Sequence, residues 1–395
     1  MTYDPVKDVS ADAPVPAEPA QREPRPYAPL YRVTPPSSVL IPMTYEEAEA
    51  LRQRSQNPLR ARAPRSSTAP RGTVRPSEVS FEELERSTVA RHYNKRREVG
   101  RDARELSPII PLKRFNNWIK SALISMYAQV GQQPDQGARV LEMGCGKGGD
   151  LRKWDRHRPA MMVLIDIADV SIEQARQRYE EGHYRWAAEF FAFDCFRRPL
   201  DEVVPRPLLE PLFDTVSMQF CMHYGWDSEE NARMMLSNAA RWLRPGGTLI
   251  GTTVDDETLL ARLHENEHSL SFGNECYRIE FDQRHEPGEK PFGDRYHFWL
   301  LDAVDDVPEF VVDWAAFERI ANEYGLHVIY KARFDQILSD GYANRPLRQL
   351  LERMQVIDPN MAAAGVVTPA MSPAMWHVCT LYLGFALEKR VDATD

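Results

Sequence analysis

The chain has 395 residues, and 43% of them are hydrophobic, which is enough to bury at least one large core. A net charge of −9 argues against a protein that coats long nucleic acid with its whole surface, but not against one that recognises a nucleic-acid end. The five widely spaced cysteines form no C-x-x-C pair and no apolar run approaches a membrane span, so we expect no disulfide framework, no metal site and no membrane partner.

The amino-terminal region, residues 1–86, is predicted to be a disordered tail. It holds 14 of the 30 prolines before Ser77 and shows no sustained apolar periodicity, so it cannot offset the entropy of ordering. It also lacks the charged and apolar segments of a signal peptide, which favours an intracellular protein. Residues 52–75 contain seven arginines and no acidic residue. Whether this basic block is a solvated tail, an RNA-steering arm or a nuclear-import arm stays open.

Order is expected over residues 87–390, and the first clear helix begins near Leu112. Apolar residues recur there at three- and four-residue steps to Val130, which predicts one buried helical face. Asn116 and Asn117 are poor choices inside a helix because their amides compete for backbone hydrogen bonds. The pair therefore indicates either ligand contact or a frayed or capping position.

A strand over residues 139–143 is expected to break into a glycine-rich loop. Gly144, Gly146 and Gly149 spell G-x-G-x-x-G, and glycines let the backbone approach a ligand where a Cβ would clash. Alone this pattern is weak, because dinucleotide-binding folds and simple tight turns share it.

Strands and helices then alternate along the chain. Apolar runs predict strands over residues 161–167, 189–194, 213–219 and 248–254, with a helix opened by a capping box at Ser171 and another from Ser228. Two later strands, 326–334 and 376–387, are expected to pair antiparallel at an edge. Insertions are expected at about 269–312, with a hairpin of 276–281 and 296–301, and at about 344–372. The alternation predicts an α/β fold with a doubly wound, mostly parallel sheet.

Polar residues at the strand ends indicate the ligand. In open α/β sheets Gly144, Asp166, Asp194 and Gln219 would meet at the carboxyl edge. Asp166 can accept from both ribose hydroxyls of an adenosine, and Asp194 from its exocyclic amine. Asp150 places negative charge where a pyrophosphate would sit, so a cationic ligand such as S-adenosylmethionine fits better than NAD. The pattern resembles the Rossmann-like class I methyltransferase architecture; a dinucleotide fold or an inactive relative remains an alternative.

A narrower resemblance rests on several motifs between residues 91 and 389. They are His92-Tyr-Asn, Phe115-Asn-Asn-Trp-Ile-Lys-Ser, Leu141 to Asp150, Asp166-Ile-Ala-Asp-Val-Ser, Gln219-Phe-Cys-Met-His-Tyr and Pro308-Glu-Phe. Together they resemble the eukaryotic mRNA cap guanine-N7 methyltransferase family. The resemblance implies mRNA capping in the nucleus, with the capped 5′ end of mRNA as substrate and capping enzymes or the transcription machinery as further partners.

The same resemblance implies two sets of site residues. Those expected to hold S-adenosylmethionine are Lys120, Gly144, Asp166, Asp194, Gln219 and Tyr224. Those expected to contact the cap are Asn116, Asn117, Lys147, Lys153, Arg178, His223, Glu309 and Tyr382. Within the second set, Glu309 and His223 would act in catalysis by positioning and electrostatics, without a general base.

Three functions remain in competition at this stage. The first is the cap methyltransferase. The second is a class I methyltransferase acting on another nucleobase or a small metabolite, which would need no 5′ triphosphate bridge. The third is a cap-binding or scaffold protein that has lost its donor, against which Gly144, Asp166 and Asp194 speak.

Overall fold

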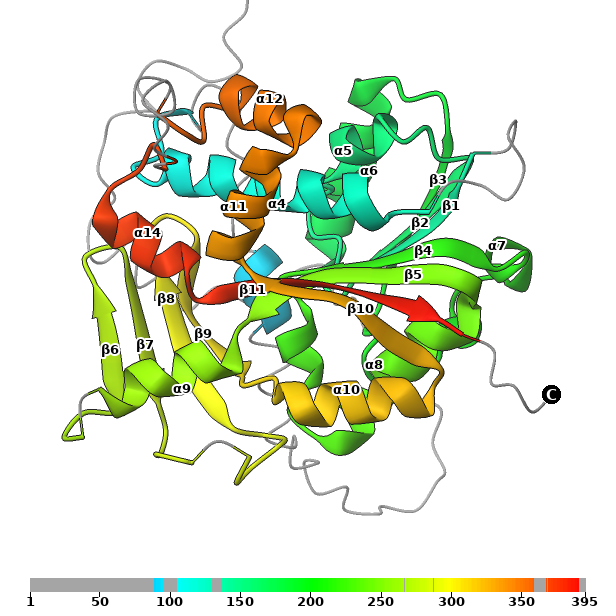
Figure 1. The fold of residues 1–395 in the computed structure, drawn as a ribbon. Coiled ribbons are helices and arrows are strands. Elements are labelled where there is room, and N and C mark those ends of the chain that lie inside the picture. Colours follow the sequence, from blue (N-terminus) through cyan, green and yellow to red (C-terminus); the bar gives the residue numbers. More distant parts are fainter. Residues whose placement is uncertain are drawn as a thin grey trace, which may run out of the picture. The chain divides into compact units, whose positions relative to one another are not determined.

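A computed structural model describes residues 89–94, 105–129, 137–265, 267–286, 288–358, 367 and 369–390 (Figure 1). All of them belong to one unit that begins at Ser77. The predicted tail, residues 1–86, and its arginine block lie outside the described residues, so the boundary expected at residue 87 stays a prediction. In the described part, no helix is long and apolar enough to cross a membrane.

A seven-stranded sheet in the order β10-β11-β5-β4-β1-β2-β3 forms the centre of the fold (Figure 1). The strands are β1 (Arg139–Met143), β2 (Met161–Asp166), β3 (Ala187–Ala192), β4 (Phe213–Gln219), β5 (Leu243–Val254), β10 (Leu326–Arg333) and β11 (Tyr382–Lys389). The first five are parallel, whereas β11 pairs antiparallel with both β5 and β10. The order reverses between β1 and β4, which confirms the predicted doubly wound sheet.

Helices cover both faces of this sheet, which is why inner strands such as β2 and β4 are buried on both faces. Successive residues of β1, Val140 and Leu141, enter different core clusters because they point to opposite faces. On one face lie α8 (Glu229–Trp242) and α10 (Trp314–Glu323), and on the other α4 (Ile110–Tyr127) and α6 (Asp169–Gly182). The structure further describes a helical segment at residues 89–94 and the helices α5 (Leu151–Asp155), η2 (Leu200–Glu202), α7 (Arg206–Leu209), η3 (Met222–Gly225), α9 (Asp256–His264), α11 (Phe334–Ala343), α12 (Arg345–Arg353) and α14 (Pro373–Cys379).

The first expected insertion contains a second, antiparallel sheet. Its strands are β6 (Ser271–Asn274), β7 (Tyr277–Phe281), β8 (Arg295–Leu300) and β9 (Val304–Phe310). The predicted hairpin is its central pair, β7 and β8. Alternate residues of these two strands are buried, as expected for a sheet with one packed face. The last strand, β9, contacts η3, which follows β4 at the carboxyl edge of the central sheet.

The carboxyl-terminal strand predicted over residues 376–387 is wrong in its first part. Those residues enter α14 before β11 begins at Tyr382. The Ser372 hydroxyl caps α14 by accepting from the N–H of Met375 at 3.3 Å, and Pro373 stands at the first helical position, where its missing N–H costs nothing. In the second expected insertion the structure describes α12 and an isolated bridge between Ile357 and Pro369.

The predicted capping box at Ser171 is also wrong. The helix α6 begins two residues earlier, at Asp169, and Ser171 is buried within its first turn. The N–H of Val170 donates to Asp169 Oδ1 at 2.9 Å and to Asn94 Oδ1 at 3.1 Å, so one of its two partners lies outside the helix. The contact with Asn94, which is distant in the chain, leaves no local signal in the sequence.

Candidate active site

The glycine-rich loop after β1 forms one wall of the site. Gly144, Gly146 and Gly148 have φ angles of 72°, 53° and 67°, which side chains disfavour. A Cβ on Gly144 would lie 2.6 Å from the Cβ of Cys221, so the loop can pass the end of β4 only as glycine. The N–H of Gly146 donates to Asp166 Oδ2 at 2.7 Å, which ties the loop to the end of β2.

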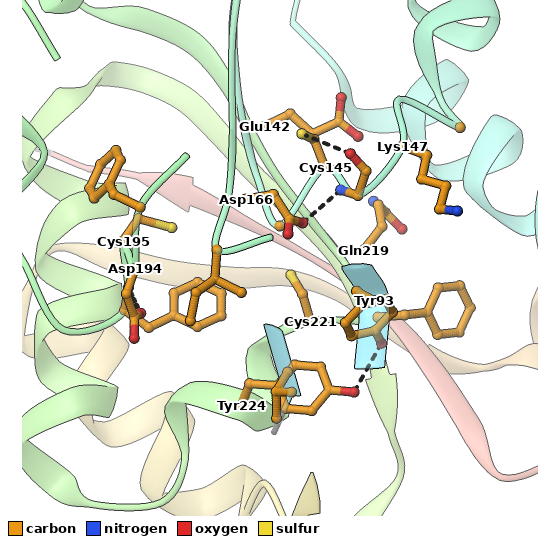
Figure 2. A pocket seen from close by; sticks show the side chains of 18 of the residues that line it. Tyr93, Glu142, Cys145, Lys147, Asp166, Asp194, Cys195, Gln219, Cys221 and Tyr224 are labelled. Atoms are coloured by element: carbon orange, nitrogen blue, oxygen red, sulfur yellow. Dashed lines mark hydrogen bonds between the residues drawn. The ribbon is translucent and has the colours of Figure 1, made fainter. Parts of the chain in front are cut away.

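A cavity of about 380 Å³ opens beside this loop, beyond the carboxyl ends of the parallel strands. Small-molecule sites typically measure roughly 300–1,000 Å³. Figure 2 shows that side chains from widely separated parts of the chain surround the cavity. All six residues expected to hold the methyl donor line it: Lys120, Gly144, Asp166, Asp194, Gln219 and Tyr224. Two residues expected to contact the cap, Lys147 and Arg178, also lie on its wall.

Backbone donors hold Asp166 in place at the end of β2. Its Oδ2 accepts from Gly146, and its Oδ1 accepts from the N–H of Ala168 at 2.9 Å. Burial raises the pKa of this carboxyl, although the backbone N–H groups counteract part of the effect. A carboxylate has about four lone-pair positions, so acceptor capacity remains for the ribose hydroxyls of a ligand.

Asp194 lies beyond the end of β3 next to a partly buried arginine that sequence reasoning missed. Arg197 approaches Asp194 Oδ2 at 3.7 Å and also forms an ion pair with Asp227. The other oxygen of Asp194 accepts from the N–H of Phe196 at 3.1 Å. Arg197 and Asp227 both line the cavity. The arginine thus offsets part of the negative charge at the end expected to receive the adenine.

A buried charge network lies behind the glycine loop and centres on Asp150. Lys120 contacts its two oxygens at 2.7 and 2.9 Å, and Lys153 contacts Oδ1 at 2.6 Å. Burial alone would raise the pKa of Asp150, but the charges of Lys120 and Lys153 together hold it below its usual value. Lys153 also donates to Asn117 Oδ1 at 2.8 Å. The network joins α4, the loop and α5.

Three residues expected to contact the cap, Asn116, Asn117 and Lys153, are not among those that line the cavity. Both asparagines lie in the middle of α4, which excludes a frayed or capping position. The Asn117 amide donates back to Lys113 O at 2.9 Å, whereas Asn116 Oδ1 is buried without a partner in the described part of the chain. Their assignment to the cap stays a prediction.

A second cluster lies next to the cavity, around Glu309 on β9. Its Oε2 accepts from the Tyr296 hydroxyl at 2.8 Å, and its Oε1 is 3.6 Å from His223 Nε2. Burial raises the pKa of Glu309 to about 7, with hydrogen bonds from Tyr296 and Tyr224 acting in the opposite direction. Tyr382 is buried near this carboxyl too.

His223 is buried and neutral at physiological pH. Burial lowers its pKa to about 3, and neither ring nitrogen has a hydrogen-bond partner among the described residues. Its ring packs against that of Tyr224 at 4.2 Å between centroids. Tyr224 lines the cavity and hydrogen-bonds with Glu309, so it belongs to both parts of the site.

A helical segment, residues 89–94, covers part of the cavity. Val89 and Tyr93 line it, and the hydroxyls of Tyr93 and Tyr224 are 3.0 Å apart (Figure 2). Asn94 donates to Asp169 Oδ1 at 2.8 Å, which fixes the segment to the start of α6. The sequence singled out Tyr93 and Asn94 as part of a motif but suggested no role for either.

The acidic and thiol groups on the wall do not form a nucleophilic site. Burial raises the pKa of the Cys145, Cys195 and Cys221 thiols well above the usual range, which disfavours the reactive thiolate. Burial, with the negative charge of Asp150, raises the pKa of Glu142 to about 8, and its Oε2 has no hydrogen-bond partner among the described residues. Across the described part, no three His, Cys, Asp or Glu side chains are grouped to hold a metal ion.

Comparison with known proteins identifies the family. Residues 78–390 match the family model described as the mRNA (guanine-N(7))-methyltransferase domain. The chain belongs to this family. A relative from Cryptococcus neoformans, named mRNA cap guanine-N(7) methyltransferase, is 45% identical over 308 residues, which are 77% of this chain and 48% of the relative. The chain therefore spans about half the length of that protein.

Two further relatives are matched over more of their length. The mRNA cap guanine-N(7) methyltransferase of Schizosaccharomyces pombe is 40% identical over 304 residues, covering 76% of this chain and 82% of the relative. The mRNA cap guanine-N(7) methyltransferase 1 of Arabidopsis thaliana is 38% identical over 314 residues, covering 76% and 81%. The matches support the resemblance seen in the motifs and do not favour the metabolite or scaffold alternatives.

Proposed function

We propose that this domain transfers a methyl group from S-adenosylmethionine to N7 of the guanosine cap of mRNA. The observation that carries the proposal is the adjacency of two sites that share Tyr224. One is the cavity lined by all six residues expected to hold the donor, and the other is the buried cluster around Glu309. Membership of the family supports the same reaction.

The residues around the cavity suit S-adenosylmethionine. Asp166 would accept from the ribose hydroxyls, Asp194 from the adenine amine, and Lys120 would donate to the methionine carboxylate. Lys120 keeps donor capacity for that role, because an ammonium has three N–H groups and Asp150 engages two contacts. When bound, the sulfonium of this donor supplies an electrophilic methyl group.

The acceptor needs orientation rather than deprotonation. Guanine N7 carries a free lone pair at neutral pH, so no proton has to be removed. The neutral His223 and the aromatic ring of Tyr224 would pack against the base and align it with the donor cavity. Holding two reactants in line can contribute on the order of 7–11 kcal/mol to the lowering of the barrier.

Electrostatics at Glu309 would supply a further part of the catalysis. Its carboxylate would accept from guanine N1–H and the 2-amino group, which fixes the base in its plane. As the methyl group transfers, positive charge moves onto the guanine ring, and a buried carboxylate stabilises that charge more than water can. Lys147 and Arg178 on the cavity wall would meet the triphosphate bridge.

The direct test is transfer of labelled methyl from S-adenosylmethionine to RNA ending in unmethylated GpppN, with uncapped triphosphate RNA in parallel. After digestion, we expect N7-methylguanosine from the capped substrate only. Equal labelling of both RNAs, or label on another base, would overturn the choice of acceptor. Donor binding measured by calorimetry without any transfer would also count against it.

We further propose that the protein works in the nucleus together with capping enzymes or the transcription machinery. This follows from the substrate, because an unmethylated cap belongs to a transcript in the process of maturation. Imaging of the tagged full chain should show nuclear signal, and exclusion from the nucleus would contradict the proposal.

A further inference from the structure

Glu309 is held by a residue of the second sheet that belongs neither to the residues expected to hold the donor nor to those expected to contact the cap. Tyr296 on β8 and Glu309 on β9 are register partners in antiparallel strands, so their side chains stand side by side. The Tyr296 hydroxyl donates to Glu309 Oε2 at 2.8 Å. Both side chains are buried, with 0% of Tyr296 and 4% of Glu309 exposed.

Among the residues that the structure describes, those around Glu309 offer three hydroxyls and one imidazole but no lysine or arginine. The titratable groups that face it are Tyr296 from β8, His223 and Tyr224 from η3, and Tyr382 from β11. None of the four carries a positive charge, because His223 is neutral. A buried carboxylate without a cationic partner is costly, and such an arrangement is more typical of functional sites than of structural ones.

The substrate can supply the positive charge that the described residues do not place beside Glu309. Guanine offers two N–H donors to the carboxylate, and methylation at N7 adds a positive charge to the same ring. A lysine or arginine beside Glu309 would neutralise it before the reaction and reduce the gain in the transition state. A tyrosine hydroxyl stabilises and orients the carboxylate while leaving its charge in place.

We propose that Tyr296 is a positioning residue for the acceptor, whose hydroxyl donates to Glu309 and orients its carboxylate to accept from the N1–H and 2-amino edge of guanine. This inference rests on the proposed function. It also gives the second sheet a purpose, since β8 and β9 bring a donor and an acceptor from one insertion to the edge of the donor cavity.

The chain provides a matched control in Tyr277 on β7. Tyr277 is likewise 0% exposed, and its hydroxyl accepts from Arg262 at 3.1 Å and lies 3.0 Å from His377 Nδ1. Replacing either tyrosine by phenylalanine removes one buried hydroxyl from the same sheet. Only Tyr296→Phe removes a hydrogen bond from Glu309.

The experiment compares the full-length wild-type chain, Tyr296→Phe and Tyr277→Phe in methyl transfer to RNA ending in GpppA across a range of pH. For Tyr296→Phe we expect KM for capped RNA to rise on the order of tenfold at neutral pH. KM for S-adenosylmethionine should stay unchanged. Because the lost hydrogen bond favours the ionised form, the acidic limb of kcat/KM for the cap should move to higher pH.

A second substrate tests whether Glu309 recognises the N1–H and 2-amino edge of guanine. A cap with inosine in place of guanosine lacks the 2-amino group, so the wild-type enzyme should prefer the guanosine cap. Tyr296→Phe should lower this preference, and Tyr277→Phe should retain it. Ionisations of the RNA itself are common to all three proteins and cannot produce a difference between them.

Each outcome separates the inference from the function on which it rests. If the wild-type chain fails to methylate capped RNA, the proposed function is wrong and the role of Tyr296 falls with it. If the wild type is active and Tyr296→Phe shows the same pH profile and cap preference as Tyr277→Phe, only the role of Tyr296 is refuted. Equal displacement of both profiles would mean a general structural effect and would refute it as well.

Discussion

The charge network around Asp150 makes a quantitative prediction for Asp150→Asn. The substitution leaves the size of the side chain almost unchanged but removes the charge that two lysines share. The Lys120 and Lys153 side chains are 16% and 11% exposed, so water can replace the lost partner only poorly. Removing one member of a buried ion pair typically costs about 3–5 kcal/mol.

This cost is large compared with the stability of a typical domain, about 5–15 kcal/mol. For a domain of this size it corresponds to a fall in the melting temperature of roughly 5–8 °C. Thermal unfolding at neutral pH measures it. Asp305→Asn is the control, because it removes an exposed carboxylate from β9 and should leave the melting temperature nearly unchanged.

The pH dependence of the difference provides a second check. The pKa of Asp150 is lower in the folded protein than its usual 3.8, so the folded state binds this proton less readily than the unfolded state. The stabilisation is therefore fully present above about pH 4 and is lost as the pH falls further. If Asp150→Asn melts within about 2 °C of the wild type at neutral pH, the network does not stabilise the fold and the reasoning is wrong.

Three further substitutions test separate parts of the site. Gly144→Ala should destabilise the fold by at least about 1–2 kcal/mol, because φ is positive there and Cys221 leaves no room for a Cβ. It should also abolish donor binding in calorimetry. Binding at wild-type affinity would show that the loop can adapt. Asp166→Ala should raise KM for the donor on the order of 100-fold without changing KM for the cap, and an unchanged donor KM would remove this residue from the ribose contact. Glu309→Gln should lower turnover with donor affinity retained, and it should abolish the rise of kcat/KM through about pH 7 that ionisation of this carboxyl would give the wild type, as a pH series of initial rates can show.

The sequence was sufficient for the central fold because its signals are local and repeated. The strand 213–219 was predicted with the bounds that β4 has, and all seven of its residues are buried although polar side chains alternate with Phe213, Val216 and Met218. Prediction failed where a short helix and a strand adjoin, as at Trp376. There, capping by Ser372 outweighed the preference of aromatic and β-branched residues for strands.

The residues expected around the donor were also within reach of the sequence. Asp166 and Gln219 follow directly from the rule that parallel strands gather their carboxyl ends at one edge. The assignments to the cap came from family resemblance, and the structure brings only some of them to the cavity. Glu309 and His223 lie beside it, in a cluster that depends on the inserted sheet, for which no such rule exists.

The partners of these residues could not be predicted. Asp150 looked like a repulsive charge beside a phosphate site, and only the structure shows that it neutralises lysines from two helices. Tyr296 looked like one end of a hairpin, since its contact with Glu309 depends on the register of two inserted strands. Such pairings require three-dimensional information, because the pattern of apolar residues fixes which face a side chain takes but not what it meets.

Three buried carboxyl groups near the cavity illustrate how the environment sets chemistry. Asp150 has a pKa below the usual range because two lysines face it, whereas burial with the nearby charge of Asp150 raises the pKa of Glu142 to about 8. Burial raises the pKa of Glu309 to about 7, and hydroxyls moderate the rise. At neutral pH only Asp150 is therefore held in a single charge state. A guanine bound beside Glu309 would favour the ionised form of this carboxyl, because it brings two N–H donors and then gains a positive charge. This is the physical reason to place the acceptor there.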